Sequence, residues 1–537
     1  FIDSLRLGNQ SDLPISRENN SHNKFYMLPF ILGIIGLIYH FNRQKNDTWV
    51  VFLLFLMTGL AIVVFLNQYP LQPRERDYAY AGSFYAFAIW IGLGVLGIIE
   101  FLQKLIKKNE VAIAGAVVGM TFALVPLIMA QQGWEDHDRS GKYAARDFAK
   151  NYLKGCDKHS VMLTFGDNDT FPLWYVQEVE NYRSDVRVLN HMLASGHWYV
   201  QQMFSKVYES DPLPFTLKKE QYNNGVNNYI PIYEHPSLEN KYTELKELID
   251  FVAMDDDRSK LSVSGGQKIN YFPSRKIRLT VDAKKCVENG IVPRELADKI
   301  VPYIEWEIKQ NALYKNDLAV LDFLATNNWE RSIYTANPSS ITDFMNVDKY
   351  LHQEGMVYKF MPVEADNYYE GIGGVNPDKT YEIFMNTSWG NINKPDVSVD
   401  RESSRNSRLP RQNYLRAAET FLYREEKAKA VELLDKCIEF FPDNKVQYDM
   451  MLIPFAEVYY GADETEKANA VVSRLIDIYE DDLRYFSSVR NSFGEKYFST
   501  SAERTVRLLR NLSQLARMNG QTDLATRVDD VLSRYGG

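Results

Sequence analysis

Apolar residues are concentrated in the first quarter of the chain. Four stretches contain no Asp, Glu, Lys or Arg, namely 25–41, 49–66, 81–99 and 111–130. About 20 helical residues cross the roughly 30 Å of hydrocarbon in a bilayer, and a charge at the centre of such a helix costs roughly 2.5–3.5 kcal/mol. Buried core helices of this length usually show a polar stripe. The pattern therefore predicts four transmembrane helices.

The connecting loops predict how these helices are oriented. Loops 42–48 and 100–110 lie on the same side and carry Arg43, Lys45, Lys104, Lys107 and Lys108. The bias is weakened by basic residues on the opposite side, namely Arg17, Lys24, Arg74, Arg76, Arg139 and Lys142. Short basic loops stay in the cytoplasm. We therefore expect the opposite loop, 67–80, and the large polar region that follows the fourth span to lie outside the cytoplasm.

The loop between the second and third spans contains four consecutive charged residues. Arg74, Glu75, Arg76 and Asp77 stand between Pro73 and a run of aromatic residues. They are either simple interfacial anchors or an anion site. In the second interpretation the guanidinium groups of Arg74 and Arg76 bind a lipid phosphate, and the carboxylates of Glu75 and Asp77 orient them.

A different periodicity begins after residue 131. The sequence predicts a helix at 138–155, a strand at 161–165, a turn at GDNDT, a helix at 171–180 and a strand at 185–190. A strand, helix and strand in this order usually form a parallel pair with a right-handed crossover. An α/β domain is therefore expected.

Polar residues follow the first of these strands. Asp167, Asn168 and Asp169 stand where ligands usually bind, outside the carboxyl ends of parallel strands, and Trp174 follows on the helix. The carboxylates could cap the helix, contact a ligand or partner in a cleft, or hold a divalent cation. Capping or turn chemistry is favoured over ligand contact, and no metal is expected.

The rest of this region is less regular. Residues 210–260 are acidic and aromatic and are interpreted as an insertion with a mostly solvated surface. We expect a hairpin from 269–272 and 276–280, a helix at 317–326, and strands at 332–335 and 356–363. His191 and His197 are interpreted as structural or surface residues.

The last part of the chain is predicted to be helical. Residues 401–412 are polar and basic, and we interpret them as a linker. Beyond them, small and large apolar residues alternate as in helix pairs of the tetratricopeptide type. A peptide-binding groove is one possible consequence of such pairs.

Composition and motifs exclude several functions. The net charge of −9 and the absence of a basic domain argue against nucleic acid as a partner. The three cysteines lie far apart and form neither a disulfide framework nor a metal motif. No Gly-rich phosphate loop precedes the strand, turn and helix, which disfavours a nucleotide-sugar enzyme. The chain begins with Phe1, and we expect an N-terminal portion to be missing.

Four segments resemble a known family of bacterial membrane proteins, the domain of unknown function 2723 family. They are PRERDYAYAGSFYAFAIWIGLGV (73–95), LTFGDNDTFPLWYVQEVENYRSDVRVLN (163–190), DFLATNNWERSIYTAN (322–337) and LHQEGMVYKFMPV (351–363). That family is similar to animal endoplasmic-reticulum protein O-mannosyltransferases with tetratricopeptide tails. The likeness covers essentially the whole chain, and its first two segments are the most specific.

The resemblance implies a glycosyltransferase of the GT-C type. Such enzymes transfer a sugar, here mannose-like, from a polyprenyl-phosphate donor to Ser or Thr of an acceptor protein on the extracytoplasmic face. The catalytic carboxylate is expected in the first extracytoplasmic loop, which this sequence lacks. The expected location is the bacterial inner membrane, with the C-terminal region in the periplasm and with membrane lipid and an acceptor protein as partners. A non-enzymatic scaffold for envelope protein assembly is the competing interpretation.

These expectations define a domain plan. It places an extracytoplasmic loop at 1–24, four GT-C-like spans within 25–130, an α/β domain at 131–400, a linker at 401–412, and tetratricopeptide-like repeats at 413–537.

Overall fold

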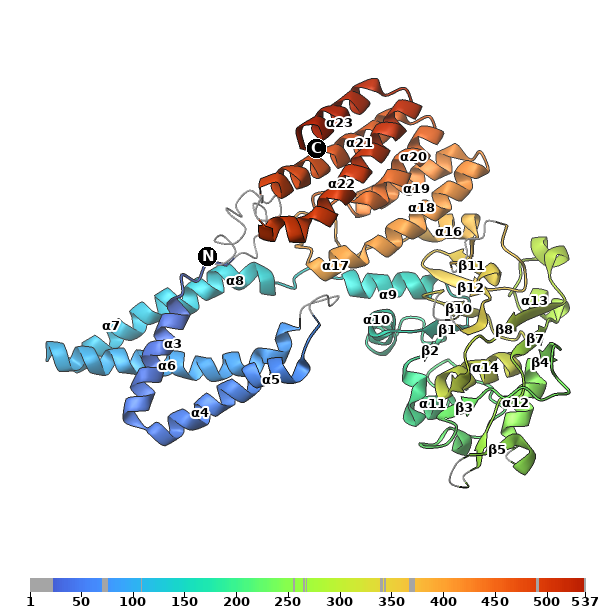
Figure 1. Cartoon of the computed structure of the whole chain (residues 1–537), viewed down its shortest axis with the longest axis horizontal. Helices are drawn as coiled ribbons and strands as arrows, with labels where there is room; N and C mark the ends of the chain where they lie inside the picture. The colour runs from blue at the N-terminus through green and yellow to red at the C-terminus, as the bar shows by residue number, and fades with distance from the viewer. Residues whose placement is uncertain are drawn as a thin grey trace. The chain divides into compact units, whose positions relative to one another are not determined.

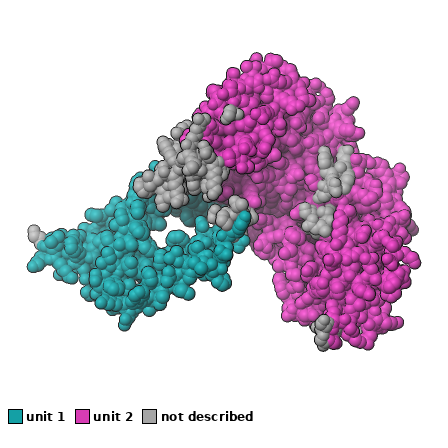
Figure 2. All heavy atoms as spheres, viewed as in Figure 1, with its two compact units in different colours: residues 1–139 teal, residues 140–537 magenta. Residues whose placement is uncertain are grey.

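The computed structural model consists of two compact units, Phe1–Arg139 and Ser140–Gly537, which Figure 2 colours separately. It describes residues 23–69, 76–107, 109–254, 256–263, 266, 268–338, 341, 344–366, 372–488 and 492–535. The predicted loop at 1–24 lies almost entirely outside these residues. Elements are labelled in Figure 1.

Apolar helices make up the first unit. They are α3 (Leu28–Arg43), α4 (Lys45–Thr58), α5 (Leu60–Leu66), α6 (Ala81–Ile106), α7 (Glu110–Phe122) and α8 (Ile128–His137). Within the described residues, three helical stretches are long and apolar enough to cross a membrane: Lys45–Leu66, Asp77–Ile106 and Glu110–His137. The first joins α4 and α5 across Gly59. The last runs through a π-helical segment that contains Pro126, which has no N–H for the α-helical ladder.

The first predicted span is a shorter helix than expected. Tyr26 and Met27 have positive φ angles of 51° and 58°, and Pro29 stands in the first turn, so α3 begins at Leu28 and has 16 residues. At 1.5 Å per residue it is about 24 Å long. Of the four predicted transmembrane helices, the structure thus has three as long apolar helical stretches and the first as a shorter apolar helix.

Small residues let α3 and α6 pack closely. A Cβ atom at Gly36 would lie 1.7 Å from the carbonyl oxygen of Trp90, and one at Gly94 would lie 2.2 Å from that of Leu32. Close backbone approach through glycine is typical of helices that pack within a bilayer. Packing therefore explains Gly36 and Gly94.

A six-stranded mixed sheet forms the centre of the second unit, in the order β13-β11-β12-β10-β1-β2. Its strands are β1 (Val161–Thr164), β2 (Arg187–Asn190), β10 (Ile333–Thr335), β11 (Leu351–Glu354), β12 (Val357–Phe360) and β13 (Gly374–Val375). β1 is parallel to both neighbours: Val161 pairs with Arg187 on β2 and with Ile333 on β10. β12 is antiparallel to β10 and β11. The predicted parallel pair is thus present within a mixed sheet.

Helices cover both faces of this sheet. α9 (Ala144–Gly155), α10 (Asp167–Glu178) and α16 (Pro377–Met385) share one core with Met162 of β1. The other core contains Val161 and Leu163, together with α11 (His197–Met203), α12 (Leu245–Ala253) and α14 (Lys315–Asn327). Successive residues of β1 therefore enter opposite cores, as strand geometry requires.

The segment between β2 and β10 differs from the prediction. Residues predicted to form a solvated insertion supply Leu213, Tyr222 and Leu248 to the core, because apolar residues interrupt the acidic sequence. The predicted hairpin is also wrong. β6 (Lys268–Asn270) pairs with β5 (Lys260–Ser262), whereas β7 (Lys276–Thr280) pairs with β8 (Tyr303–Glu307) and β4 (Thr243–Glu244). The remaining elements are β3 (Tyr229–Pro231), β9 (Ala312–Tyr314) and α13 (Ala283–Glu288).

Residues 401–412 are helical, and the linker prediction is wrong. They form α17 (Arg401–Asn406) and the start of α18 (Arg408–Tyr423). Arg411 is buried, and its guanidinium donates to the carbonyl oxygens of Phe441 and Val446 at 2.9 and 2.6 Å. The guanidinium of Arg416 donates to the carbonyl oxygen of Gly373 at 2.6 Å. Arg411 and Arg416 are thus buried because their donors meet backbone carbonyls, whereas Arg401, Arg405 and Arg408 stay exposed.

The C-terminal region is a stack of antiparallel helices. It contains α18, α19 (Lys427–Phe440), α20 (Ile453–Gly461), α21 (Thr465–Ser488), α22 (Ser492–Met518) and α23 (Thr522–Tyr535). α18 packs on α19, α20 on α21 and α22 on α23. The apolar core of these helices is continuous with that of α9, α10 and α16. The helical prediction is confirmed, whereas membership of the tetratricopeptide class stays a prediction.

Candidate functional site at the carboxyl edge of the sheet

The carboxyl ends of β1, β2 and β10 form the edge at which the sequence placed its candidate residues. β1 leads through α10 to β2 on one side, and β10 adjoins β1 on the other side. The chain thus adds strands first on one side of β1 and later on the other. In open α/β sheets, ligands usually bind at the point where the strand order reverses in this way. We call this edge the carboxyl edge.

The predicted GDNDT turn is the first turn of α10. Oδ2 of Asp169 accepts the backbone N–H of Phe165 at 2.9 Å, and Oδ1 accepts that of Gly166 at 2.8 Å. Burial raises the pKa of Asp169, although these hydrogen bonds act in the opposite direction. The Asp169 carboxylate therefore stabilises the turn before α10, which agrees with the capping role considered from the sequence.

Asp167 and Asn168 differ from Asp169 in exposure. Both side chains are exposed at the start of α10, where backbone N–H groups attract negative charge. Trp174, by contrast, is partly buried, and its ring lies 5.4 Å from that of Phe171 and 6.3 Å from that of Tyr199. Asp167 and Asn168 are thus available for contact, whereas Trp174 mainly joins α10 to α11.

Hydrogen bonds tie the strand ends together beneath these residues. The Thr170 hydroxyl lies 2.8 Å from the hydroxyl of Thr164, the last residue of β1. Nδ2 of Asn190, the last residue of β2, donates to Thr170 Oγ1 at 2.6 Å, and its Oδ1 accepts the N–H of Leu193 at 2.7 Å. This buried network gives the carboxyl edge a defined geometry.

The structure adds a histidine–carboxylate pair that the sequence reasoning missed. His191 directly follows β2, and its Nε2 lies 2.9 Å from Oδ1 of Asp317 on α14. The imidazole is stacked between Phe165 and Phe344, with ring centroids 5.8 and 5.6 Å away. The position of His191 after a strand was a usable signal. Its carboxylate partner lies 126 positions away along the chain, and no sequence signal pointed to it.

The charged loop before α6 belongs to the first unit. Arg74 and Glu75 lie outside the described residues. Arg76 is exposed and directly precedes the 3-10 turn Asp77–Tyr80, whose first residue, Asp77, is also exposed. This turn leads into α6. Arg76 therefore stands at the beginning of a 30-residue apolar helical stretch, as an interfacial residue would.

A metal centre finds no support in the part of the chain that the structure describes. Within it, no three His, Cys, Asp or Glu side chains are grouped so that they could hold a metal ion. The three cysteines are free and buried. Burial raises the pKa of the Cys156, Cys286 and Cys437 thiols to about 12, which keeps them protonated and poorly reactive.

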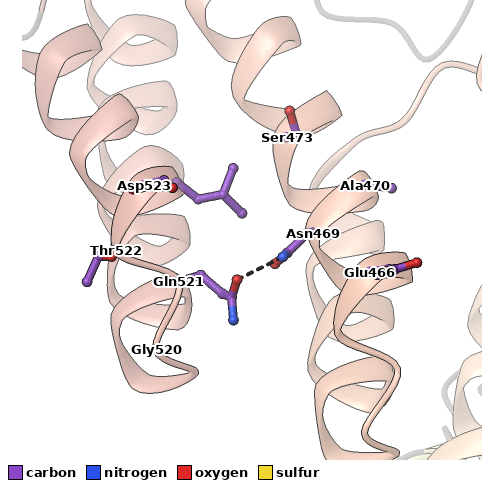
Figure 3. A pocket seen from close by; sticks show the side chains of 9 residues that line it. Glu466, Asn469, Ala470, Ser473, Gly520, Gln521, Thr522 and Asp523 are labelled. Carbon is purple, nitrogen blue, oxygen red and sulfur yellow. Dashed lines mark hydrogen bonds between the residues drawn. The ribbon is translucent and has the colours of Figure 1, made fainter.

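Two cavities lie away from the carboxyl edge. An apolar hollow of about 330 Å³ is lined by α3, α6, α7 and the π-helical segment within the first unit. A polar hollow of about 440 Å³ lies beside α21 and the loop before α23. Figure 3 shows Asn469 and Gln521 pointing toward one another there, and their side-chain amides are joined at 2.8 Å. Neither cavity is lined by a site residue that the sequence analysis predicted.

The fold and the site define a class of protein. Its members combine apolar helices long enough to span a membrane with a mixed α/β region that has a polar carboxyl edge. Residues 145–379 match the family model described as TMEM260-associated domain 2. This match spans the sheet from α9 to the start of α16, including every candidate residue of the carboxyl edge. No curated protein matches the chain. No solved structure matches it either.

Proposed function

We propose that the chain belongs to a membrane glycosyltransferase of the GT-C type, which transfers a mannose-like sugar from a polyprenyl phosphate to Ser or Thr of an acceptor protein. The observation that carries the proposal is the charged segment that begins the long apolar helix at α6. Its sequence is also among the most specific segments of the family resemblance. The similarity of residues 145–379 to a TMEM260-associated domain is compatible with it.

The chemistry needs two kinds of group. A carboxylate base must remove the proton of the acceptor hydroxyl, and cations must stabilise the departing lipid phosphate. In the proposal, Arg74 and Arg76 bind that phosphate at the membrane surface, and Glu75 and Asp77 orient the two guanidinium groups.

The proposal places the second unit outside the cytoplasm. It rests on the basic loops 42–48 and 100–110, which favour the cytoplasmic side. A phosphatase that requires export, fused to the C-terminus, should then be active in intact cells. Activity of a cytoplasmic reporter at the same position would reverse the orientation.

Arginine-to-lysine substitution tests the donor site. A guanidinium forms two parallel hydrogen bonds to a phosphate, and an ammonium group does not. Because Arg76 is exposed, Arg76→Lys should leave folding intact and lower sugar transfer by the full-length protein about tenfold or more, mainly through weaker use of the lipid donor. The measurement is transfer at several donor concentrations, with equal amounts of protein.

A matched control separates the site from general charge effects. Arg139→Lys changes another exposed arginine of the same unit and should leave transfer unchanged. Normal transfer with normal donor dependence in both Arg74→Lys and Arg76→Lys would make the loop an interfacial anchor and would remove the proposed donor site.

A scaffold for envelope proteins is the second candidate, favoured by the stacked helix pairs and the hollow beside α21. Asn469→Arg would fill that hollow. A scaffold role predicts loss of a co-purifying partner from this variant with no sugar transfer by the parent protein. A transferase predicts activity that depends on Arg76 and not on Asn469.

A further inference from the structure

An apolar surface on α10 and its neighbourhood is unusually exposed. Phe171, Tyr175 and Val179 recur every four residues and are 48%, 47% and 68% exposed. Met192 and Trp198, which follow the edge strand β2, are 53% and 49% exposed. We call these five residues the aromatic face.

Contacts between rings make the aromatic face continuous. Residues four apart on a helix project within about 40° of one another, so Phe171, Tyr175 and Val179 share one side of α10. Phe171 contacts Trp174, whose ring approaches Tyr199, and Tyr199 in turn packs against Trp198 at 5.5 Å. The buried rings thus connect the exposed side of α10 to α11.

A short connection joins this part of the second unit to the apolar helices. Only residues 138–143 separate the end of α8 from α9, and six extended residues reach about 20 Å. Tyr143 is already fixed within the second unit, because its N–H donates to the carbonyl oxygen of Gly390. The start of α9 therefore stays within that reach of the third long apolar helical stretch.

α10 lies against α9 and runs in the same direction. Arg183, just beyond α10, donates through Nη1 to the carbonyl oxygens of Leu153 and Cys156 at 2.8 Å, which brings the C-terminal ends of α9 and α10 together. Their N-terminal ends consequently meet at the carboxyl edge, where the chain arrives from α8. The aromatic face is thus on the helix pair that the membrane tether restrains.

We infer that the aromatic face docks on the lipid bilayer at the boundary between head groups and acyl chains. Trp and Tyr concentrate at that depth because a ring with a polar tip suits it. Val179 and Met192 add apolar surface without rings, which favours lipid over a ligand that stacks on rings. Docking does not depend on sugar transfer and would hold for a scaffold as well.

Site-specific quenching in the intact chain tests the inference. The three native cysteines are buried, so a thiol introduced by Tyr175→Cys can be labelled selectively with a bimane fluorophore. The full chain is reconstituted into phosphatidylcholine nanodiscs that contain lipid spin-labelled near the top of the acyl chain. Tyr423→Cys on α18, at an 82% exposed position, is the matched control.

The expected result is quenching at position 175 at least about twofold stronger than at position 423. It should be insensitive to added salt, because the aromatic face acts through apolar contact rather than charge. Val179→Cys provides a second position on the same face if Tyr175→Cys does not fold.

Two outcomes would overturn the inference. Equal quenching at the face and at position 423 would show that the face does not touch lipid. Protection of the bimane from aqueous iodide without quenching by labelled lipid would show that protein, either another part of the chain or a second copy, covers the face. Sugar transfer is not measured, so failure here leaves the proposed function untouched.

Discussion

The two edges of the central sheet both carry polar side chains, but they use them differently. At the amino edge, where β1, β2 and β10 begin, charges are paired with one another or with backbone carbonyls. Asp157 forms ion pairs with Lys359 at 2.6 Å and Lys379 at 3.3 Å, and the guanidinium Nε of Arg183 binds Asp185 at 2.8 Å. At the carboxyl edge, Asp167 and Asn168 are exposed. Charge density alone does not distinguish paired side chains from exposed ones.

The difference shows how to separate structural polar residues from available ones. The amino-edge charges satisfy backbone groups left by strand ends, as when Arg331 Nε donates to the carbonyl oxygen of His159 at 2.6 Å. Buried groups of this kind must be paired, because an unpaired one costs about 1–3 kcal/mol or more. At the carboxyl edge, the side chains of Asp169, Thr170 and Asn190 form the hydrogen bonds that hold the turn and the strand ends. Asp167 and Asn168 beside them remain exposed.

The largest expected effect comes from the amino edge. Lys359 is 3% exposed in its side chain, and Lys359→Met removes the closest cation from Asp157. Because the Asp157 side chain is 32% exposed and keeps Lys379 as a partner, loss of Lys359 should destabilise the second unit by about 2 kcal/mol. This lowers its melting temperature by about 2 °C for a unit of this size. Scanning fluorimetry of the full chain in detergent measures this shift.

Lys349→Met is the control for that experiment. Lys349 and its partner Glu364 have half-exposed side chains, and exposed pairs contribute about 1 kcal/mol at most. Equal melting temperatures for the two variants would show that the amino-edge network is no more structural than a surface ion pair.

Acid should reveal the same network through Asp157. Burial raises the pKa of Asp157, but the ammonium groups of Lys359 and Lys379 lower it more, so the pKa lies below its ordinary value. A depressed pKa in the folded state means that the carboxylate stabilises the fold above about pH 4 and loses this effect as the pH falls further. The melting temperature of Asp157→Asn should therefore be below that of the parent chain at pH 7, and the gap should narrow below about pH 4. A gap that is constant with pH would contradict the assignment.

The smallest expected effect is the difference in stability between variants of two aspartates at the carboxyl edge. Asp169→Ala removes the acceptor of two backbone N–H groups and should cost about 1 kcal/mol. Asp167→Ala changes an exposed side chain and should stay within about 0.5 kcal/mol of the parent chain. Chemical denaturation followed by tryptophan fluorescence, with both variants side by side, makes the comparison. A greater loss in Asp167→Ala would mean that Asp167 also serves the fold.

The sequence by itself determined the features that depend on local patterns. Apolar runs identified the long helices of the first unit, and the order of strand, turn, helix and strand identified β1, α10 and β2 with their parallel pairing. The helical character of the C-terminal region was also evident. These features follow from the periods of helices and strands, which neighbouring residues already display.

Tertiary structure alone decided what depends on distant partners. The partner of His191 is Asp317, and Arg411 and Arg416 donate to carbonyl groups on other elements. No local pattern could show that these two arginines are buried. The neighbours of β7 were likewise chosen by long-range pairing. The physical reason is common to all of these: a polar group becomes structural or available according to whether a complementary group meets it after folding, and sequence spacing does not record that meeting.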